Sequence, residues 1–241
     1  MFLEAKNALV FKKGNETLMI EPWGANSFRV RSTMEPNFID RDWALTEKIN
    51  HGNAKVSVTE NGASIINGKI EAKVNNNGII TFYKDGVRIL HEYHRSYDPS
   101  ATKESCCTKV INRQWQGIIG GDYKLSVRFE SNDSEKIFGM GQYQTPYLDM
   151  KGCFLELAQR NSQISIPFAV SNLGYGFLWN NPAVGHVNFA KNITEWVAEC
   201  TKEMDYWITA EDTPAKIIEN FTAAVGRAPA LTKDYLGFWQ C

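Results

Sequence analysis

Short runs of alternating apolar and polar residues, separated by Asn-Gly and Asp-Gly pairs, recur through the first part of the chain. The pairs Asn61-Gly62, Asn77-Gly78 and Asp85-Gly86 each divide two such runs. Asn-Gly and Asp-Gly favour the positive φ angles that two-residue β-hairpins need, so each pair predicts a tight turn between antiparallel strands. Strand–turn–strand units that follow one another without helices are typical of antiparallel sheets. The sequence therefore predicts an all-β fold.

The alternation also predicts which side chains are buried. Two packed antiparallel sheets enclose every second residue of each strand between them. We expect the core of such a β-sandwich to contain Phe28, Val30, Val56, Val58, Phe82, Val127, Phe129, Phe168, Val170, Phe177 and Trp179.

One segment near the C-terminus departs from the strand pattern. It has Asp212 as an N-cap, Pro214 in the first turn and Gly226 as the stop, which together predict a helix. Apolar side chains fall at helical spacing on one face of this helix. They are Ile217, Ile218, Phe221, Ala224 and Val225. The predicted fold class is therefore an all-β antiparallel β-sandwich with one C-terminal helix.

Three motifs stand in a fixed order along the second half of the chain. The first is Phe138-Gly139-Met140-Gly141-Gln142-Tyr143, the second is Gly174-Tyr175-Gly176-Phe177-Leu178-Trp179-Asn180-Asn181, and the third is Leu236-Gly237-Phe238-Trp239-Gln240-Cys241. This ordered set resembles the N-terminal β-sandwich of glycoside hydrolase family 31, the α-glucosidases and α-xylosidases. In that family the third motif is the first strand of a catalytic barrel.

The resemblance implies a domain division and a function. Residues 1–226 would form a galactose mutarotase-like supersandwich, and residues 227–241 would be a connector and the start of a truncated (β/α)8 barrel. A retaining α-glycosidase hydrolyses terminal α-linked sugars of oligosaccharides with two carboxyl groups about 5 Å apart. In the family both are aspartates on later barrel strands, so this chain would hold no catalytic residue and be inactive alone. Its partners would be its own barrel and the oligosaccharide, with a homo-oligomer possible for the full-length protein.

The loop from Gln142 to Lys151 carries the candidate substrate contacts. In the family a loop at this place reaches over the barrel mouth, which makes Gln142, Tyr143, Gln144 and Tyr147 the expected sugar-binding residues. Their aromatic and amide groups suit stacking and hydrogen bonding to a sugar. The alternative is an ordinary connection whose tyrosines pack on the sandwich. Gln142, where many members carry Glu, together with residues 158–161, resembles the α-xylosidase-like branch.

Charge and cysteine content restrict the other classes of function. A net charge of −1 argues against nucleic acid and acidic membranes as partners. The N-terminus has no apolar signal segment, and the five cysteines, with Cys106 and Cys107 adjacent, form neither a disulfide framework nor a zinc motif. We therefore expect free thiols, no cofactor, no metal and a cytoplasmic protein. Asp40 and Asp42 fit a solvated loop better than a carboxylate pair.

Two other hypotheses remain open at the level of sequence. One is a stand-alone carbohydrate-binding or aldose-epimerase-like sandwich, for which His91 or His186 could act with a glutamate as acid and base. The other is an interaction module without sugar chemistry. His91 and His94 could also suggest a metal site, but their i, i+3 spacing gives a common face only on a helix.

Overall fold

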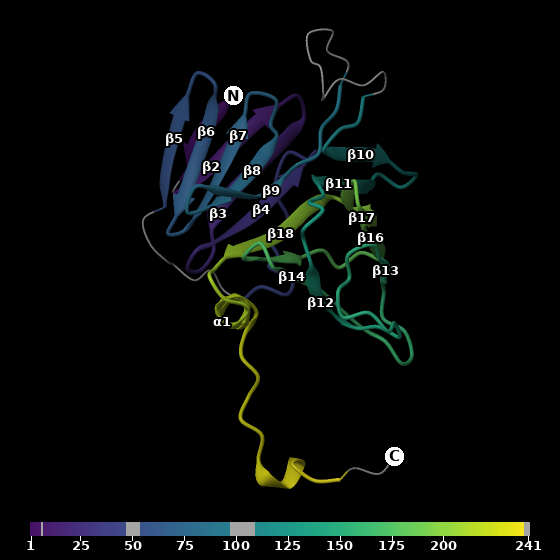
Figure 1. The fold of residues 1–241 in the computed structure, drawn as a ribbon. Coiled ribbons are helices and arrows are strands. Elements are labelled where there is room, and N and C mark those ends of the chain that lie inside the picture. The colour runs from purple at the N-terminus through teal and green to yellow at the C-terminus, as the bar shows by residue number, and fades with distance from the viewer. Residues whose placement is uncertain (6, 47–53, 97–108, 239–241) are drawn as a thin grey trace.

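The structure is a computed structural model that describes residues 1–5, 7–46, 54–96 and 109–238. Within these residues the chain forms eighteen β-strands, one α-helix and one short 3-10 helix. The strands build three antiparallel sheets (Figure 1). The all-β antiparallel prediction is therefore confirmed.

The largest sheet has eight strands in the order β1-β2-β3-β4-β18-β15-β14-β12. It joins the first four strands of the chain to later ones through the β4–β18 pair, in which Phe28 lies opposite Ile208. The strands of this eight-stranded sheet are β1 (Phe2–Ala5), β2 (Ala8–Lys13), β3 (Glu16–Pro22), β4 (Ser27–Thr33), β12 (Ile137–Gln142), β14 (Ile164–Ser171), β15 (Tyr175–Trp179) and β18 (Glu203–Ala210).

Two five-stranded sheets share the opposite layer. The first is the meander β5 (Lys55–Thr59), β6 (Gly62–Asn67), β7 (Ile70–Asn75), β8 (Ile80–Lys84) and β9 (Val87–His91). The second has the order β10-β11-β17-β16-β13, with β10 (Arg113–Gly117), β11 (Tyr123–Glu130), β13 (Phe154–Leu157), β16 (Gly185–Phe189) and β17 (Ile193–Thr201). A single bridge between Glu92 and Phe129 links the two. The predicted two-layer sandwich is present, with its second layer divided.

Aromatic contacts show that both five-stranded sheets pack on one face of the eight-stranded sheet. The Tyr206 ring on β18 lies 6.3 Å from the Phe82 ring of the first five-stranded sheet. It lies 6.0 Å from the Phe129 ring of the second. Such edge-to-face contacts add to the stabilisation from apolar burial. One continuous core therefore spans all three sheets.

Most of the predicted core residues are buried, and the exception has a clear cause. Val58 is 51% exposed, although it lies opposite Ala63 on the inward side of its strand. Its strand, β5, is the edge of the sheet, so no further strand covers it. Val56, two residues earlier, is half-buried. Phe168 and Val170 are buried in a separate cluster on the other face of the eight-stranded sheet.

Helix α1 (Pro214–Val225) covers that second cluster. The Phe221 ring stacks on the Phe168 ring at 3.9 Å. The predicted N-cap was wrong: Thr213 caps the helix by accepting the Lys216 amide, while Asp212 pairs with Lys69 and Lys84. Ile218, predicted on the apolar face, is 44% exposed.

Three strands, β1, β10 and β13, were not predicted from the sequence. The predicted C-terminal strand is not formed in the part of it that the structure describes. Near the C-terminus, η1 (Lys233–Tyr235) is a 3-10 helix, and residues 236–238 form no strand. Residues 239–241 lie outside the described residues, so the start of a barrel there stays a prediction.

Candidate functional site

Two glycines set the direction in which the chain leaves β12. Gly139 and Gly141 have φ angles of 99° and 92°, and Met140 between them has 71°. The β12–β14 register shifts between the same two glycines. A bulge of this kind bends a strand and redirects the residues after it. The Gly-Met-Gly sequence therefore turns the chain out of the sheet at Gln142.

The far end of this loop is anchored to the sandwich. Asp149 Oδ1 accepts hydrogen bonds from the Ile137 and Lys151 amides, both at 3.0 Å. The Met150 amide donates to the Ile137 carbonyl at 2.7 Å. Lys151 Nζ lies 3.3 Å from Glu135 Oε2. Both ends of the loop are thus attached to β12 or beside it, and only its middle is free of the sheet.

The four predicted contact residues divide into two groups. Gln142, Gln144 and Tyr147 are exposed, Tyr147 to 62%. Tyr143 is half-buried: its hydroxyl donates to the Glu156 carbonyl at 2.9 Å and lies 2.8 Å from Ser165 Oγ. Burial raises the pKa of the Tyr143 phenol above its ordinary value. Tyr143 packs on the sandwich, as expected for an ordinary connection, whereas Tyr147 projects into solvent.

A groove begins beside Tyr143. Ser165, the hydrogen-bond partner of Tyr143, lines a hollow of about 520 Å³ between α1 and the first residues of β14. A second hollow of about 290 Å³ shares part of this lining and extends toward β13. We call the two together the end groove. It is lined mainly by Trp43, Leu157, Gln159, Ser165, Ile166, Pro167, Asn181, Pro182, Phe221 and Val225.

Trp43 was not recognised as a site residue in the sequence. It is held at φ 55°, a left-handed conformation that is uncommon for a bulky side chain. Arg29 fixes the preceding residues by binding the Asp42 carboxylate at 2.5 Å and the Arg41 carbonyl at 2.8 Å. Asn180 Oδ1 accepts a hydrogen bond from the Ala44 amide at 3.1 Å. An isolated Trp within a polar loop was the available signal.

Glu203 is a buried carboxyl group that should make the stability of the fold depend on pH. Glu203 is 4% exposed and accepts the Ile39 amide at 2.7 Å. Burial raises its pKa from 4.5 to about 7, against the opposing effect of Arg31. A carboxyl group with a raised folded-state pKa stabilises the fold below its unfolded pKa, and that contribution is lost as the pH rises through the folded value.

We expect the free energy of unfolding to fall between pH 4.5 and 7 because of Glu203. A rise of this pKa from 4.5 to about 7 corresponds to roughly 3 kcal/mol. Urea unfolding of Glu203→Gln at pH 5 and pH 8 should show a smaller difference than the parent chain. The exposed Glu60→Gln serves as the control. Equal pH dependence in Glu203→Gln and the parent would contradict this assignment.

His91 and His186 are not among the residues that line the end groove. His91 Nδ1 lies 2.7 Å from Thr81 Oγ1. His186 stacks on Phe154 at 4.9 Å, and its Nδ1 is 3.8 Å from Glu199 Oε1. That pair has the residue types an epimerase uses, but Glu199 is 46% exposed on the outer face of a sheet. Among the described residues no cluster of three or more potential ligands forms a metal site.

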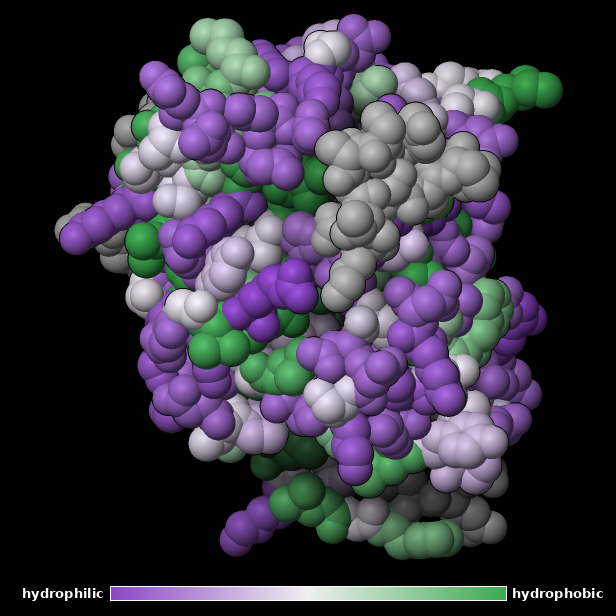
Figure 2. Space-filling view, turned by 45° about the horizontal axis from the view of Figure 1, so that its top comes forward, coloured by the Kyte–Doolittle hydropathy of each residue, from purple (hydrophilic) through white to green (hydrophobic). Residues whose placement is uncertain are grey.

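Two further sequence expectations concern thiols and membranes. Cys153 and Cys200 are free thiols, while Cys106, Cys107 and Cys241 lie outside the described residues. No helix in the described ranges has both the length and the apolar character to cross a membrane. In the space-filling view, hydrophilic residues cover most of the face, with small apolar areas between them (Figure 2).

The three packed sheets, with α1 on the outer face of the largest, define this chain as a β-supersandwich domain. Residues 17–188 match the family of glycosyl hydrolase 31 N-terminal galactose mutarotase-like domains, so the chain belongs to that family. The predicted family and supersandwich fold are therefore confirmed.

Relatives of the chain are larger proteins. It is 42% identical to a family 31 glucosidase of Pseudescherichia vulneris, over 99% of this chain and 47% of that protein. It is 30% identical to α-xylosidase A of Aspergillus niger, over 99% of this chain and 34% of that protein. A family 31 α-xylosidase from a soil metagenome, solved with xylose, superposes with a TM-score of 0.96 at 46% identity, over 100% of this chain and 37% of that one. The chain thus spans less than half of each.

Proposed function

We propose that this chain is the N-terminal domain of a retaining α-glycosidase that removes terminal α-linked sugars from oligosaccharides, with α-xylosides as preferred substrates. The observation that carries the proposal is the similarity along the whole chain to a larger family 31 α-xylosidase, at 46% identity and a TM-score of 0.96. The similarity to α-xylosidase A of Aspergillus niger supports the same substrate class. We also propose a cytoplasmic location and a homo-oligomer for the full-length protein, and only the sequence supports these two points.

The proposed role of the domain is to support the catalytic barrel and to form one wall of its substrate pocket. The connector follows α1 and runs away from the sandwich (Figure 1). It begins at Gly226, directly after Val225 of the end groove. Its apolar side chains are exposed, Leu236 to 68% and Phe238 to 93%. Burial of these groups and of the groove against a following domain would provide a favourable apolar contact.

The exposed middle of the loop would then meet the sugar. Tyr147 and Leu148 are 62% and 78% exposed on a loop whose ends are fixed. Fixed ends reduce the conformational entropy lost when such a loop orders against a ligand. Gln142 and Gln144 offer amide donors and acceptors beside them. Tyr143 holds the base of the loop through Ser165.

An activity comparison tests this function. The proposed full-length enzyme, in which this domain is joined to its catalytic barrel, should hydrolyse nitrophenyl α-xyloside with a higher kcat/KM than nitrophenyl α-glucoside. The 241-residue chain alone should hydrolyse neither, since the paired carboxyl groups are expected elsewhere. Hydrolysis by the purified 241-residue chain above the level of a mock preparation would contradict the proposal that the catalytic carboxyl groups lie outside this domain. A preference for the glucoside would overturn the proposed substrate class.

A further inference from the structure

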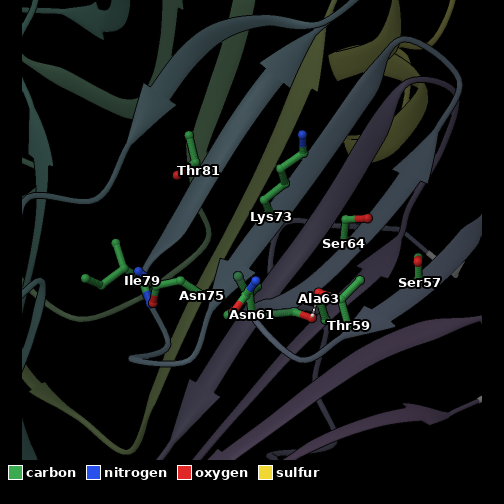
Figure 3. A pocket seen from close by; sticks show the side chains of 11 residues that line it. Ser57, Thr59, Asn61, Ala63, Ser64, Lys73, Asn75, Ile79 and Thr81 are labelled. Carbon is green, nitrogen blue, oxygen red and sulfur yellow. Dashed lines mark hydrogen bonds between the residues drawn. The ribbon is translucent and has the colours of Figure 1, made fainter.

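The outer face of the first five-stranded sheet carries an open hollow of about 350 Å³. Ser57, Ser64, Lys73 and Thr81 lie directly opposite one another on β5, β6, β7 and β8. Residues in such cross-strand register share one face of a sheet. Figure 3 shows these four side chains in a row across the strands, with Thr59, Asn61, Asn75 and Ile79 along the second side of the hollow.

The shape of the hollow follows from side-chain size. Ser57 and Ser64 are neighbours at one end of the row and have short side chains, so the sheet surface is low there. The next row on the same face carries larger side chains, because Ile66 lies opposite Glu71 and Glu71 opposite Tyr83. Ile66 is 41% exposed and Tyr83 half-buried. These larger side chains stand beside the polar row but outside the lining of the hollow.

The lining is rich in hydrogen-bonding groups and nearly neutral. Its polar side chains are hydroxyls, amides and the Lys73 ammonium, without a carboxylate among the described lining residues. Lys73 Nζ lies 3.4 Å from Glu71 Oε2 and 4.7 Å from the Tyr83 ring centre, so its charge is largely balanced. The Ser57 and Ser64 hydroxyls make no hydrogen bond to the described part of the chain. They are available as both donors and acceptors.

We propose that this hollow is a second carbohydrate-binding site, specific for a neutral oligosaccharide and separate from the loop from Gln142 to Lys151. A sugar offers many hydroxyls that both donate and accept, matching Ser57, Ser64 and Thr81, and an apolar ring face that can lie against Ala63 and Ile79 of the lining. The size of the hollow is that of a small-molecule site. The inference goes beyond the proposed function and does not depend on it.

Other occupants fit this chemistry less well. A cation would find no carboxylate in the described lining. A phosphate group favours several charge-assisted donors, whereas the hollow has one ammonium that already pairs with Glu71. A protein partner would need a larger apolar contact than Ile66 and Ile79 provide.

Calorimetric titration of the 241-residue chain with isomaltotriose and with a xyloglucan oligosaccharide tests the proposal. We expect saturable binding of at least one of them with a Kd of roughly 0.1–10 mM. Ser64→Trp, which fills the hollow, should weaken this binding at least about tenfold. Ser64→Ala, which keeps the fold and removes one hydroxyl, should weaken it roughly threefold.

The matched control is Ser126→Trp. Ser126 is a half-buried serine on the outer face of the second five-stranded sheet, opposite Gln114. This variant should bind the sugar within about twofold of the parent. Absence of saturable binding by either sugar would overturn the proposal. So would inorganic phosphate binding without sugar binding, or sugar binding that neither Ser64 variant changes.

Discussion

Replacement of Arg113 by Met is expected to lower the free energy of unfolding by roughly 3–5 kcal/mol. Arg113 Nη1 donates to both carboxylate oxygens of Glu92 at 2.6 Å, and its Nε donates to Glu16 at 2.6 Å. Glu92 is fully buried, and desolvation already raises the pKa of its carboxyl group. Removing the guanidinium would leave this carboxylate buried without its cation.

Urea unfolding monitored by tryptophan fluorescence measures the effect. The double variant Arg113→Met/Glu92→Gln should regain part of the loss, because it removes the buried charge as well. The control is Arg160→Met, which breaks an exposed pair with Glu156 and should cost less than about 1 kcal/mol. A loss below about 1 kcal/mol for Arg113→Met would show that the pair does not hold the sheets together.

Gly141→Ala is expected to be the most damaging small substitution near the candidate site. A Cβ at this position would overlap the Ile164 carbonyl oxygen and lie 2.7 Å from the Ile166 amide nitrogen. The φ of 92° is also unfavourable for any L side chain. Because the obstacles are backbone atoms, β12 must separate from β14. We expect a loss of roughly 3 kcal/mol or more, together with displacement of the loop from Gln142 to Lys151.

The Gly152→Ala variant separates the backbone clash from the cost of the positive φ. Gly152 has a similar φ of 88°, but a Cβ there would meet no described atom within 4 Å. Only the conformational cost of about 1 kcal/mol should remain. Thermal unfolding of the two variants compares them directly. Equal losses would mean that the contact between β12 and β14 is not the cause.

The fold could be predicted where local chemistry decides it. The hairpin from β8 to β9 follows from Asp85 and Gly86, turn residues whose preference for positive φ does not depend on distant contacts. β10 could not be predicted in this way, because it contains Arg113 and two glutamines. Arg113 is buried only through partners far away in the chain, Glu16 and Glu92.

The same distinction applies to the edges of the sheets. Alternation shows which side of a strand faces inward but not whether another strand covers that side. Val58 is therefore exposed although its pattern is correct. At the helix, Asp212 and Thr213 both suit an N-cap, and the choice depends on Lys69 and Lys84, which bind Asp212 from distant strands.

The candidate site could be predicted in part. Two glycines so close together favour a sharp turn, and the structure has that turn at Gly139 and Gly141, followed by an exposed Tyr147. The separate orientation of Tyr143 could not be predicted, since it depends on Ser165 across the sheet. Trp43 joins the site through Arg29 and Asn180, which are remote in sequence.

The role of the loop as a pocket wall is tested most directly by kcat/KM of the Tyr147→Ala variant of the longer protein, measured with nitrophenyl α-xyloside. We expect a decrease of about 5- to 150-fold, equivalent to roughly 1–3 kcal/mol of lost contact, because Tyr147 is exposed and holds no part of the fold together. The melting temperature should barely change. Val87→Ala, at an exposed position on β9, should leave both quantities unchanged. An unchanged kcat/KM with a lowered melting temperature for Tyr147→Ala would contradict the proposed pocket wall.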